Sequence, residues 1–129
     1  MEKLELYLKK ANDNLKVAKE LFNKGYKDIA VSRLYYSVFY AIEALLLKEN
    51  KYFKKHSGVI SYFGKEYAKK GKISPEFHRF VINLFELREN ADYEPVFDVD
   101  DEELLKFFDN AGIFINLIEK KIKESEKKE

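Results

Sequence analysis

The sequence predicts an all-α protein: an up-and-down four-helix bundle with an additional short helix. Apolar residues recur at alternating spacings of three and four along most of the chain, which is the period of an amphipathic helix. No segment alternates apolar and polar residues between turn signals, as a half-buried strand does. The 129 residues are enough for one domain with one core. We assign that domain to residues 1–124 and expect the charged tail, residues 125–129, to fray.

The first two predicted helices differ in how much of their surface is apolar. The first has one apolar stripe over residues 4–22 and ends near Gly25, which suits the left-handed conformation of a helix C-cap. The second spans about residues 28–49 and is apolar on nearly all sides, which predicts burial on all sides. Charged side chains within it argue against a membrane span. Between residues 29 and 47 the exceptions to its apolar or aromatic character are Ser32, Arg33, Ser37 and Glu43.

Three further helices follow, each with a recognisable start or stop. The third begins near residue 57 and stops before Gly71. The pair Ser74-Pro75 opens the fourth, because serine is a favoured N-cap and proline a favoured first helical residue. Pro95 prevents this helix from continuing. The fifth begins near Asp100, with Glu103 three residues later as in a capping box.

The bulk composition excludes several classes of protein. The net charge is +1, so no global field draws the chain to nucleic acid or to a membrane, and a polyanion would bind a local patch. There is no cysteine, which excludes disulfides and thiolate metal sites. The charged start MEKLELYLKK lacks the apolar core of a signal peptide, so we expect a cytoplasmic protein. Abundant Lys, Glu and Ile favour a heat-adapted source.

Arginine is rare, since the 24 basic residues include only Arg33, Arg79 and Arg88. In a chain that uses lysine on its surface, an arginine marks a place where the planar guanidinium matters. At about 100° per residue, Arg88 falls on the apolar stripe of the fourth helix, and Arg33 lies within the apolar second helix. A guanidinium there needs an acceptor, for which Asp92 and Glu43 are candidates. Alternatively, one or both arginines face a groove and bind a phosphate or carboxylate.

Neither histidine has the spacing of a metal site, and we expect no metal and no cofactor. His56 lies at the start of the third helix, where its ring either hydrogen-bonds a carbonyl or acts as a general acid or base. It is also a candidate anion contact, together with Lys54, Lys55 and the helix N-terminus. We expect His78, near the start of the fourth helix, to lie at the surface.

The second helix carries both tyrosines and small residues. We expect hydroxyls of its tyrosines to join Glu43 in an internal polar network. Small residues on one side of it permit close approach of another helix. An all-round apolar helix in so short a chain has more surface than its neighbours easily cover, so we expect a homodimer through the second or fourth helix. The tyrosines are Tyr35, Tyr36 and Tyr40, and the small residues are Ala30, Ser37 and Ala44.

Three stretches together resemble the HEPN superfamily, and in particular its small, stand-alone prokaryotic branch. They are SRLYYSVFYAIEALLL on the second helix, KKHSGVISYF after it, and LRENADYEP at the end of the fourth. The resemblance covers about residues 3–120. It implies a helical bundle that dimerises and that is often encoded beside a minimal nucleotidyltransferase. Many HEPN proteins are metal-independent ribonucleases of toxin or defence systems.

The resemblance also implies a site. In HEPN ribonucleases an arginine is followed, after four to six residues, by a histidine, and the pair is duplicated across a dimer groove. Arg88 matches the arginine, but positions 93–95 are Tyr, Glu and Pro. Asp92 and His56 are then candidates for the proton transfers that RNA cleavage requires, whereas Tyr93, with an ordinary pKa near 10, is a poor base. Tyr93 is also a candidate for nucleotide modification by a partner enzyme, by its proximity to the motif.

Three functions remain open at this point. The first is a binding and regulatory module, a dimer that acts with a nucleotidyltransferase and binds nucleotide or nucleic acid near Arg88. The second is a ribonuclease that has rearranged its acid and base. The third is a structural helical dimer in which Arg88, Asp92 and Glu43 form internal salt bridges.

Overall fold

A computed structural model describes residues 2–127 of the chain, and the side chains of residues 3–126. All of its regular elements are helical; no strand occurs in this part of the chain. In order, they are α1 (Glu2–Asn23), α2 (Lys27–Lys48), α3 (His56–Phe63), the π-helical segment η1 (Gly64–Ala68), α4 (Pro75–Tyr93) and α5 (Asp101–Lys127). The predicted all-α bundle of four long helices and one short helix is confirmed.

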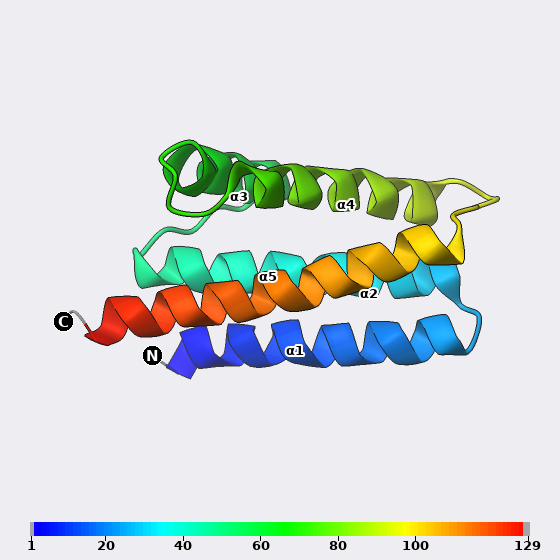
Figure 1. Cartoon of the computed structure of the whole chain (residues 1–129), viewed down its shortest axis with the longest axis horizontal. Coiled ribbons are helices and arrows are strands. Elements are labelled where there is room, and N and C mark those ends of the chain that lie inside the picture. Colours follow the sequence, from blue (N-terminus) through cyan, green and yellow to red (C-terminus); the bar gives the residue numbers. More distant parts are fainter. Residues whose placement is uncertain (1, 128–129) are drawn as a thin grey trace.

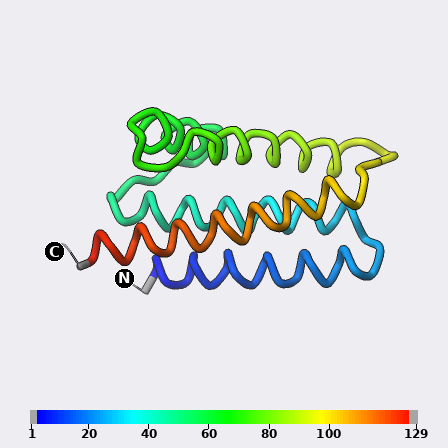
Figure 2. The backbone as a smooth tube through the Cα atoms, viewed as in Figure 1, coloured from blue at the N-terminus to red at the C-terminus, as the bar shows by residue number. Residues whose placement is uncertain are grey.

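The four long helices run along the long axis of the molecule, as Figure 1 shows. Helices α1, α2 and α5 lie side by side, α4 packs against α2 and α5, and α3 is seen nearly end-on beside the start of α4. The loops α1–α2 and α4–α5 lie together at the end opposite the two termini (Figure 2). This arrangement brings the start of α2 and the end of α4 to the same end of the bundle.

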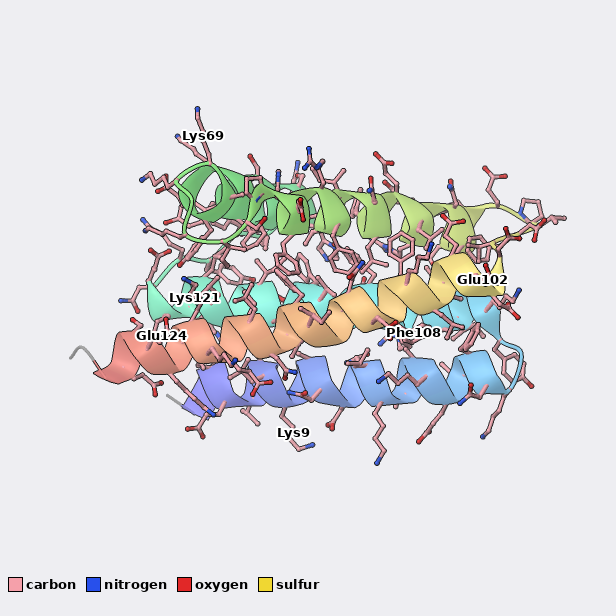
Figure 3. All side chains as sticks on the ribbon, in the orientation of Figure 1. Lys9, Lys69, Glu102, Phe108, Lys121 and Glu124 are labelled. Atoms are coloured by element: carbon pink, nitrogen blue, oxygen red, sulfur yellow. The ribbon has the colours of Figure 1, made fainter. Side chains whose placement is uncertain are left out.

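Helix α2 is the centre of the core. It contacts α1, α3, α4 and α5, and 12 of its 22 residues are buried. Among the described residues it is the one helix long and apolar enough to cross a membrane, but 67% of its most apolar window is buried within the bundle. Its hydropathy is therefore that of a core helix. In Figure 3, Phe108 of α5 lies between the ribbons, whereas Lys9 and Lys69 extend away from them.

The burial of α2 bears on the reasoning behind the predicted dimer. Its apolar surface was expected to exceed what neighbouring helices easily cover. The neighbouring helices bury most of it: Ile29 is its one exposed large apolar side chain among the described residues, and Tyr36 and Tyr40 are half-buried. The homodimer stays a prediction.

Helix boundaries follow the predicted signals, with two differences. Gly25 and Gly71 adopt positive φ angles of 92° and 74°, as expected where helices end at glycine. Ser74 is the residue before α4 and Pro75 its first residue, but the Ser74 side chain makes no capping hydrogen bond. The predicted third helix is two segments, because the backbone widens after Phe63 into π-helical pairing, with Lys69 N–H bonded to Gly64 C=O at 2.8 Å.

The carboxyl end of the chain is helical for as far as it is described. Helix α5 continues to Lys127, past the domain boundary that we placed at residue 124. Residues 128 and 129 of the predicted tail lie outside the described residues. The single-domain assignment and the fraying of the tail stay predictions.

Candidate functional site

Arg88 lies on the face of α4 that packs against α2. Its guanidinium carbon is 4.8 Å from the centroid of the Tyr35 ring and 5.6 Å from the centroids of Tyr36 and Phe85. Its side chain is only 14% exposed. The predicted position of Arg88 on the apolar side of its helix is confirmed. A guanidinium over aromatic faces at these distances makes a favourable cation–π contact.

The polar groups of Arg88 are only partly satisfied. One terminal nitrogen donates to Asp92 Oδ2 at 3.2 Å, one helical turn further along α4. The Nε atom is buried and has no hydrogen-bond partner in the described structure. A buried donor without an acceptor costs about 1–3 kcal/mol. This arginine is therefore not in the arrangement that would best stabilise the fold.

His56, the first residue of α3, lies close to the same aromatic rings. Its Nδ1 is 2.9 Å from the hydroxyl of Tyr35, and its ring stacks on Phe39 with centroids 4.1 Å apart. The ring centroid is also 5.7 Å from that of Tyr36. Three helices thus place a histidine and Arg88 around one pair of tyrosines.

Burial and the charge of Arg88 shift the pKa values of His56 and Tyr35. Burial lowers the pKa of His56, and the positive charge of Arg88 lowers it further. Burial raises the pKa of Tyr35, against the opposing effect of Arg88. Near neutral pH His56 is therefore an uncharged imidazole, and Tyr35 keeps its hydroxyl proton. That hydroxyl lies on a side chain with 0% exposure.

Arg33 approaches the same place from the start of α2. Its guanidinium carbon is 4.8 Å from the centroid of the Tyr36 ring, and its Nη1 donates to Asn14 Oδ1 of α1 at 3.1 Å. Arg33, Arg88 and His56 thus all lie within 6 Å of the Tyr36 ring centroid. We call Tyr36 and these three residues the Tyr36 cluster. It gathers two of the three arginines in the chain.

A groove of about 280 Å³ lies between α2 and α4 beside the Tyr36 cluster. Arg33 and Asp92 both line it, so it adjoins the ion pair of Arg88. Its size is at the lower limit for a small-molecule pocket, so it fits one phosphate-bearing group rather than a whole large ligand. The remaining lining residues are Asp28, Ile29, Ser32 and Ala91.

Other predicted site residues lie elsewhere. Tyr93, the last residue of α4, is 75% exposed, and Lys54 and Lys55 are exposed before α3. Glu43 is not an acceptor for either arginine, which corrects that expectation. It is half-buried two to three turns further along α2, where burial raises its pKa and the charges of Lys10 and Lys3 oppose the rise.

No hydrogen bond joins Glu43 to Tyr35, Tyr36 or Tyr40 in the described structure, although the three tyrosine rings contact one another in series. Tyr40 packs against the rings of Tyr7 and Tyr36, with Lys10 5.2 Å above it. The hydroxyl of Tyr35 bonds to His56 instead, so Tyr35 belongs to the Arg88 site.

The expectation that His78 lies at the surface is wrong. Its ring is half-buried against Gly64, and its Nε2 is buried without a partner among the described residues. A Cβ at Gly64 would overlap this ring, which explains why glycine starts the π-helical segment. No group of three or more potential ligands that could hold a metal occurs among the residues described.

Reasoning from sequence missed the importance of Tyr36 and Asn14. A signal for Tyr36 was present, because Arg33 and Tyr36 are three residues apart on one helix and such pairs are neighbours on its surface. Asn14 has no such signal, since it lies on another helix.

The chain also matches a known family of proteins. The HEPN domain profile matches residues 4–122, nearly the whole bundle. The chain belongs to the HEPN domain family. The resemblance noted in the sequence is thereby confirmed, and the HEPN domain accounts for all of the long helices described.

Relatives of this HEPN protein cover most of its length. Two proteins of Methanocaldococcus jannaschii, each bearing the name "Putative toxin", are 36% and 38% identical to it. The first match covers 91% of this chain and 80% of the relative, and the second covers 95% and 91%. A protein of Thermotoga maritima named "UPF0332 protein" is 35% identical, over 94% of this chain and 92% of its own length.

The HEPN motif differs here from the arginine–histidine pattern that the resemblance implies. The arginine is present as Arg88, and Tyr93 occupies the first of the positions where a histidine is expected. The histidine that lies near Arg88 is His56, which comes from a different helix.

Proposed function

We propose that this HEPN protein is a binding and regulatory module of a toxin-type system. It binds a phosphate-bearing ligand, nucleotide or RNA, at the Tyr36 cluster and the adjoining groove. The names of its relatives favour a toxin-type system. The positions of Arg88 and Arg33 support an anionic ligand, because both guanidinium groups lie against the Tyr36 ring, and Arg33 and Asp92, the ion-pair partner of Arg88, line one groove.

The observation that carries this proposal is the incomplete pairing of Arg88. Its one ion-pair partner, Asp92, is exposed at the surface, and its Nε lacks an acceptor in the part of the chain that is described. A purely structural arginine would have its donors satisfied, since unpaired donors destabilise a fold. A ligand with several acceptor oxygens suits such a guanidinium.

The proposal includes a homodimer and a minimal nucleotidyltransferase as partner, in the cytoplasm. Exposed apolar side chains near the groove support an interface at this end of the bundle. Ile29 lines the groove and is 50% exposed, and Tyr93 and Val96, which follow Asp92 in the chain, are 75% and 83% exposed. Clusters of exposed apolar residues are typical of interaction sites.

A binding experiment tests the ligand. Fluorescence anisotropy with labelled single-stranded RNA, and calorimetry with ATP, are compared for the wild type, Arg88→Ala, Arg33→Ala and Arg79→Ala. Arg79 is the control, because it is an exposed arginine of α4 away from the cluster. We expect about tenfold weaker binding for Arg88→Ala and Arg33→Ala, and no change for Arg79→Ala. Equal binding by all four proteins contradicts the proposal.

Sedimentation tests the assembly separately. Analytical ultracentrifugation of the wild type and of Ile29→Lys gives the mass in solution. A dimer that Ile29→Lys dissociates is the expected result. A monomeric wild type removes the dimer from the proposal and leaves the ligand site to be judged by binding alone.

The second candidate function is a metal-independent ribonuclease with a variant site. One observation favours it: the fold brings a histidine, His56, close enough to Arg88 for the two to interact electrostatically. RNA cleavage needs proton transfer and positive charge on the phosphorane. Cleavage of RNA by the wild type in the presence of EDTA, lost in Arg88→Ala and kept in Arg79→Ala, would establish this second function.

A further inference from the structure

Tyr35 and His56 form a hydrogen bond, and their surroundings determine which of the two donates it. Tyr35 is fully buried, its hydroxyl lies 2.9 Å from Nδ1 of His56, and its other polar neighbour, the Arg88 guanidinium, can only donate a hydrogen bond. If Nδ1 carried the proton and donated, the buried hydroxyl proton would have no acceptor, at a cost of about 1–3 kcal/mol. The hydroxyl therefore donates and Nδ1 accepts.

Because Nδ1 accepts this hydrogen bond, the protonation of the other ring nitrogen of His56, Nε2, is also determined. A neutral imidazole with an accepting Nδ1 carries its proton on Nε2. Nε2 has no hydrogen-bond partner in the described structure and, unlike Nε2 of His78, is not buried. The side of His56 away from Tyr35 is therefore an N–H donor that is not fully buried and has no partner among the described residues.

Resting on the function proposed above, we propose that His56 is a third phosphate contact, which donates from Nε2 to the phosphate group that Arg88 and Arg33 bind. Tyr35 is the positioning residue that holds His56 in this tautomer. The site takes a phosphate group, carried by a nucleotide or by RNA or as free phosphate, because such a group accepts hydrogen bonds from several directions.

The composition of the Tyr36 cluster supports binding over proton transfer. Arg33 and Arg88 only donate, and the neutral His56 also presents a donor. Two of the acceptors beside them are already engaged, since Asp92 accepts from Arg88 and Asn14 Oδ1 accepts from Arg33, and the carboxylate of Asp28 also lines the groove. Burial and the charge of Arg88 both lower the pKa of His56, which disfavours the imidazolium form that would donate a proton in cleavage.

Nuclear magnetic resonance tests the tautomer without any ligand. Long-range ¹H–¹⁵N spectra report which ring nitrogen carries the proton, and the chain has only two histidines, so the His78→Gln variant assigns both. We expect His56 in the Nε2–H form in the wild type, and a mixture of tautomers in Tyr35→Phe. An Nδ1–H form in the folded wild type overturns the inference, whatever the protein binds.

Binding tests the role of Nε2. Inorganic phosphate, AMP and a short oligoribonucleotide are titrated into the wild type, His56→Gln and His56→Leu, with melting curves to establish folding. A glutamine amide offers an N–H near the position of Nε2 but does not titrate. We expect binding within about threefold of wild type for His56→Gln and about tenfold weaker for His56→Leu. The three probes distinguish free phosphate, nucleotide and RNA as the source of the group.

The outcomes separate this inference from the proposed function. Binding that depends on Arg88 but is unchanged in His56→Leu overturns the role of His56 and leaves the proposed function standing. No binding of any probe to the wild type overturns both. RNA cleavage that disappears in His56→Gln while RNA binding is kept would make His56 an acid or base, and would also overturn the inference.

Discussion

Replacing Arg88 by methionine separates a binding arginine from a structural one. Methionine keeps an unbranched apolar chain of similar length, so the packing against Tyr35 and Phe85 is largely retained. The substitution removes the cation–π contacts, the ion pair with Asp92 and the buried Nε. The question is how these contributions balance in the free energy of unfolding.

The favourable and unfavourable contributions of Arg88 are similar in size. A largely desolvated cation–π contact contributes up to about 2 kcal/mol. The ion pair contributes less than about 1 kcal/mol, because the Asp92 side chain is 32% exposed and water screens it. The unpaired buried Nε costs about 1–3 kcal/mol. We therefore expect Arg88→Met to change the free energy of unfolding by less than about 1.5 kcal/mol in either direction.

Urea denaturation followed by circular dichroism measures this change, with Arg79→Met as the control on the same helix. In parallel, RNA and nucleotide binding by Arg88→Met is expected to fall about tenfold. A loss of more than about 3 kcal/mol of stability, without a loss of binding, would refute this reasoning. Arg88 would then be a structural residue, and the purely structural helical dimer would be the favoured function.

Three further predictions follow from the same geometry. Asp92→Asn removes the carboxylate that competes with an anion for Arg88, so phosphate binding should tighten about twofold to fivefold in calorimetry; weaker binding would contradict this. Because the pKa of His56 is lowered from 6.5 in the fold, the unfolded chain binds the proton first, and stability should fall as the pH drops below about 6.5. That fall should be smaller in His56→Gln, and equal urea midpoints against pH for the two proteins would show that His56 is not its source. Glu43→Gln should raise the melting temperature at pH 7 by about 2–5 °C, because burial raises the pKa of Glu43 and so disfavours its charged form in the fold. A lower melting temperature would show that Lys10 and Lys3 more than offset its burial.

Features within one helix could be predicted from the sequence. The helical period put Arg88 on the apolar face of α4, and the spacing of four residues put Asp92 within its reach. Glycine and proline indicated where helices end, since α1 ends two residues before Gly25 and α4 begins at Pro75 and ends two residues before Pro95. These predictions succeed because the helical repeat alone fixes which side chains are neighbours along one helix.

Features between helices could not be predicted in this way, and the site depends on them. Glu43 and His56 were both candidates to lie near Arg88, and no local rule distinguishes them. The π-helical segment after α3 allows Gly64 to meet His78 on α4, and His56 at the start of α3 then stacks on Phe39 of α2. These contacts join residues 14 and 17 positions apart on different elements, so they depend on how whole helices pack.

The same packing explains how a HEPN bundle can lack the motif histidine and still place a histidine beside its arginine. A motif residue on α4 would share a helix with Arg88 and move with it. His56 is instead fixed to α2, through Phe39 and the hydroxyl of Tyr35. Its ring is positioned by core residues and its Nδ1 is already engaged, so the nitrogen left for a ligand is a donor. A group held in that way is suited to recognising a phosphate, whereas proton transfer would require Tyr35 to release the ring.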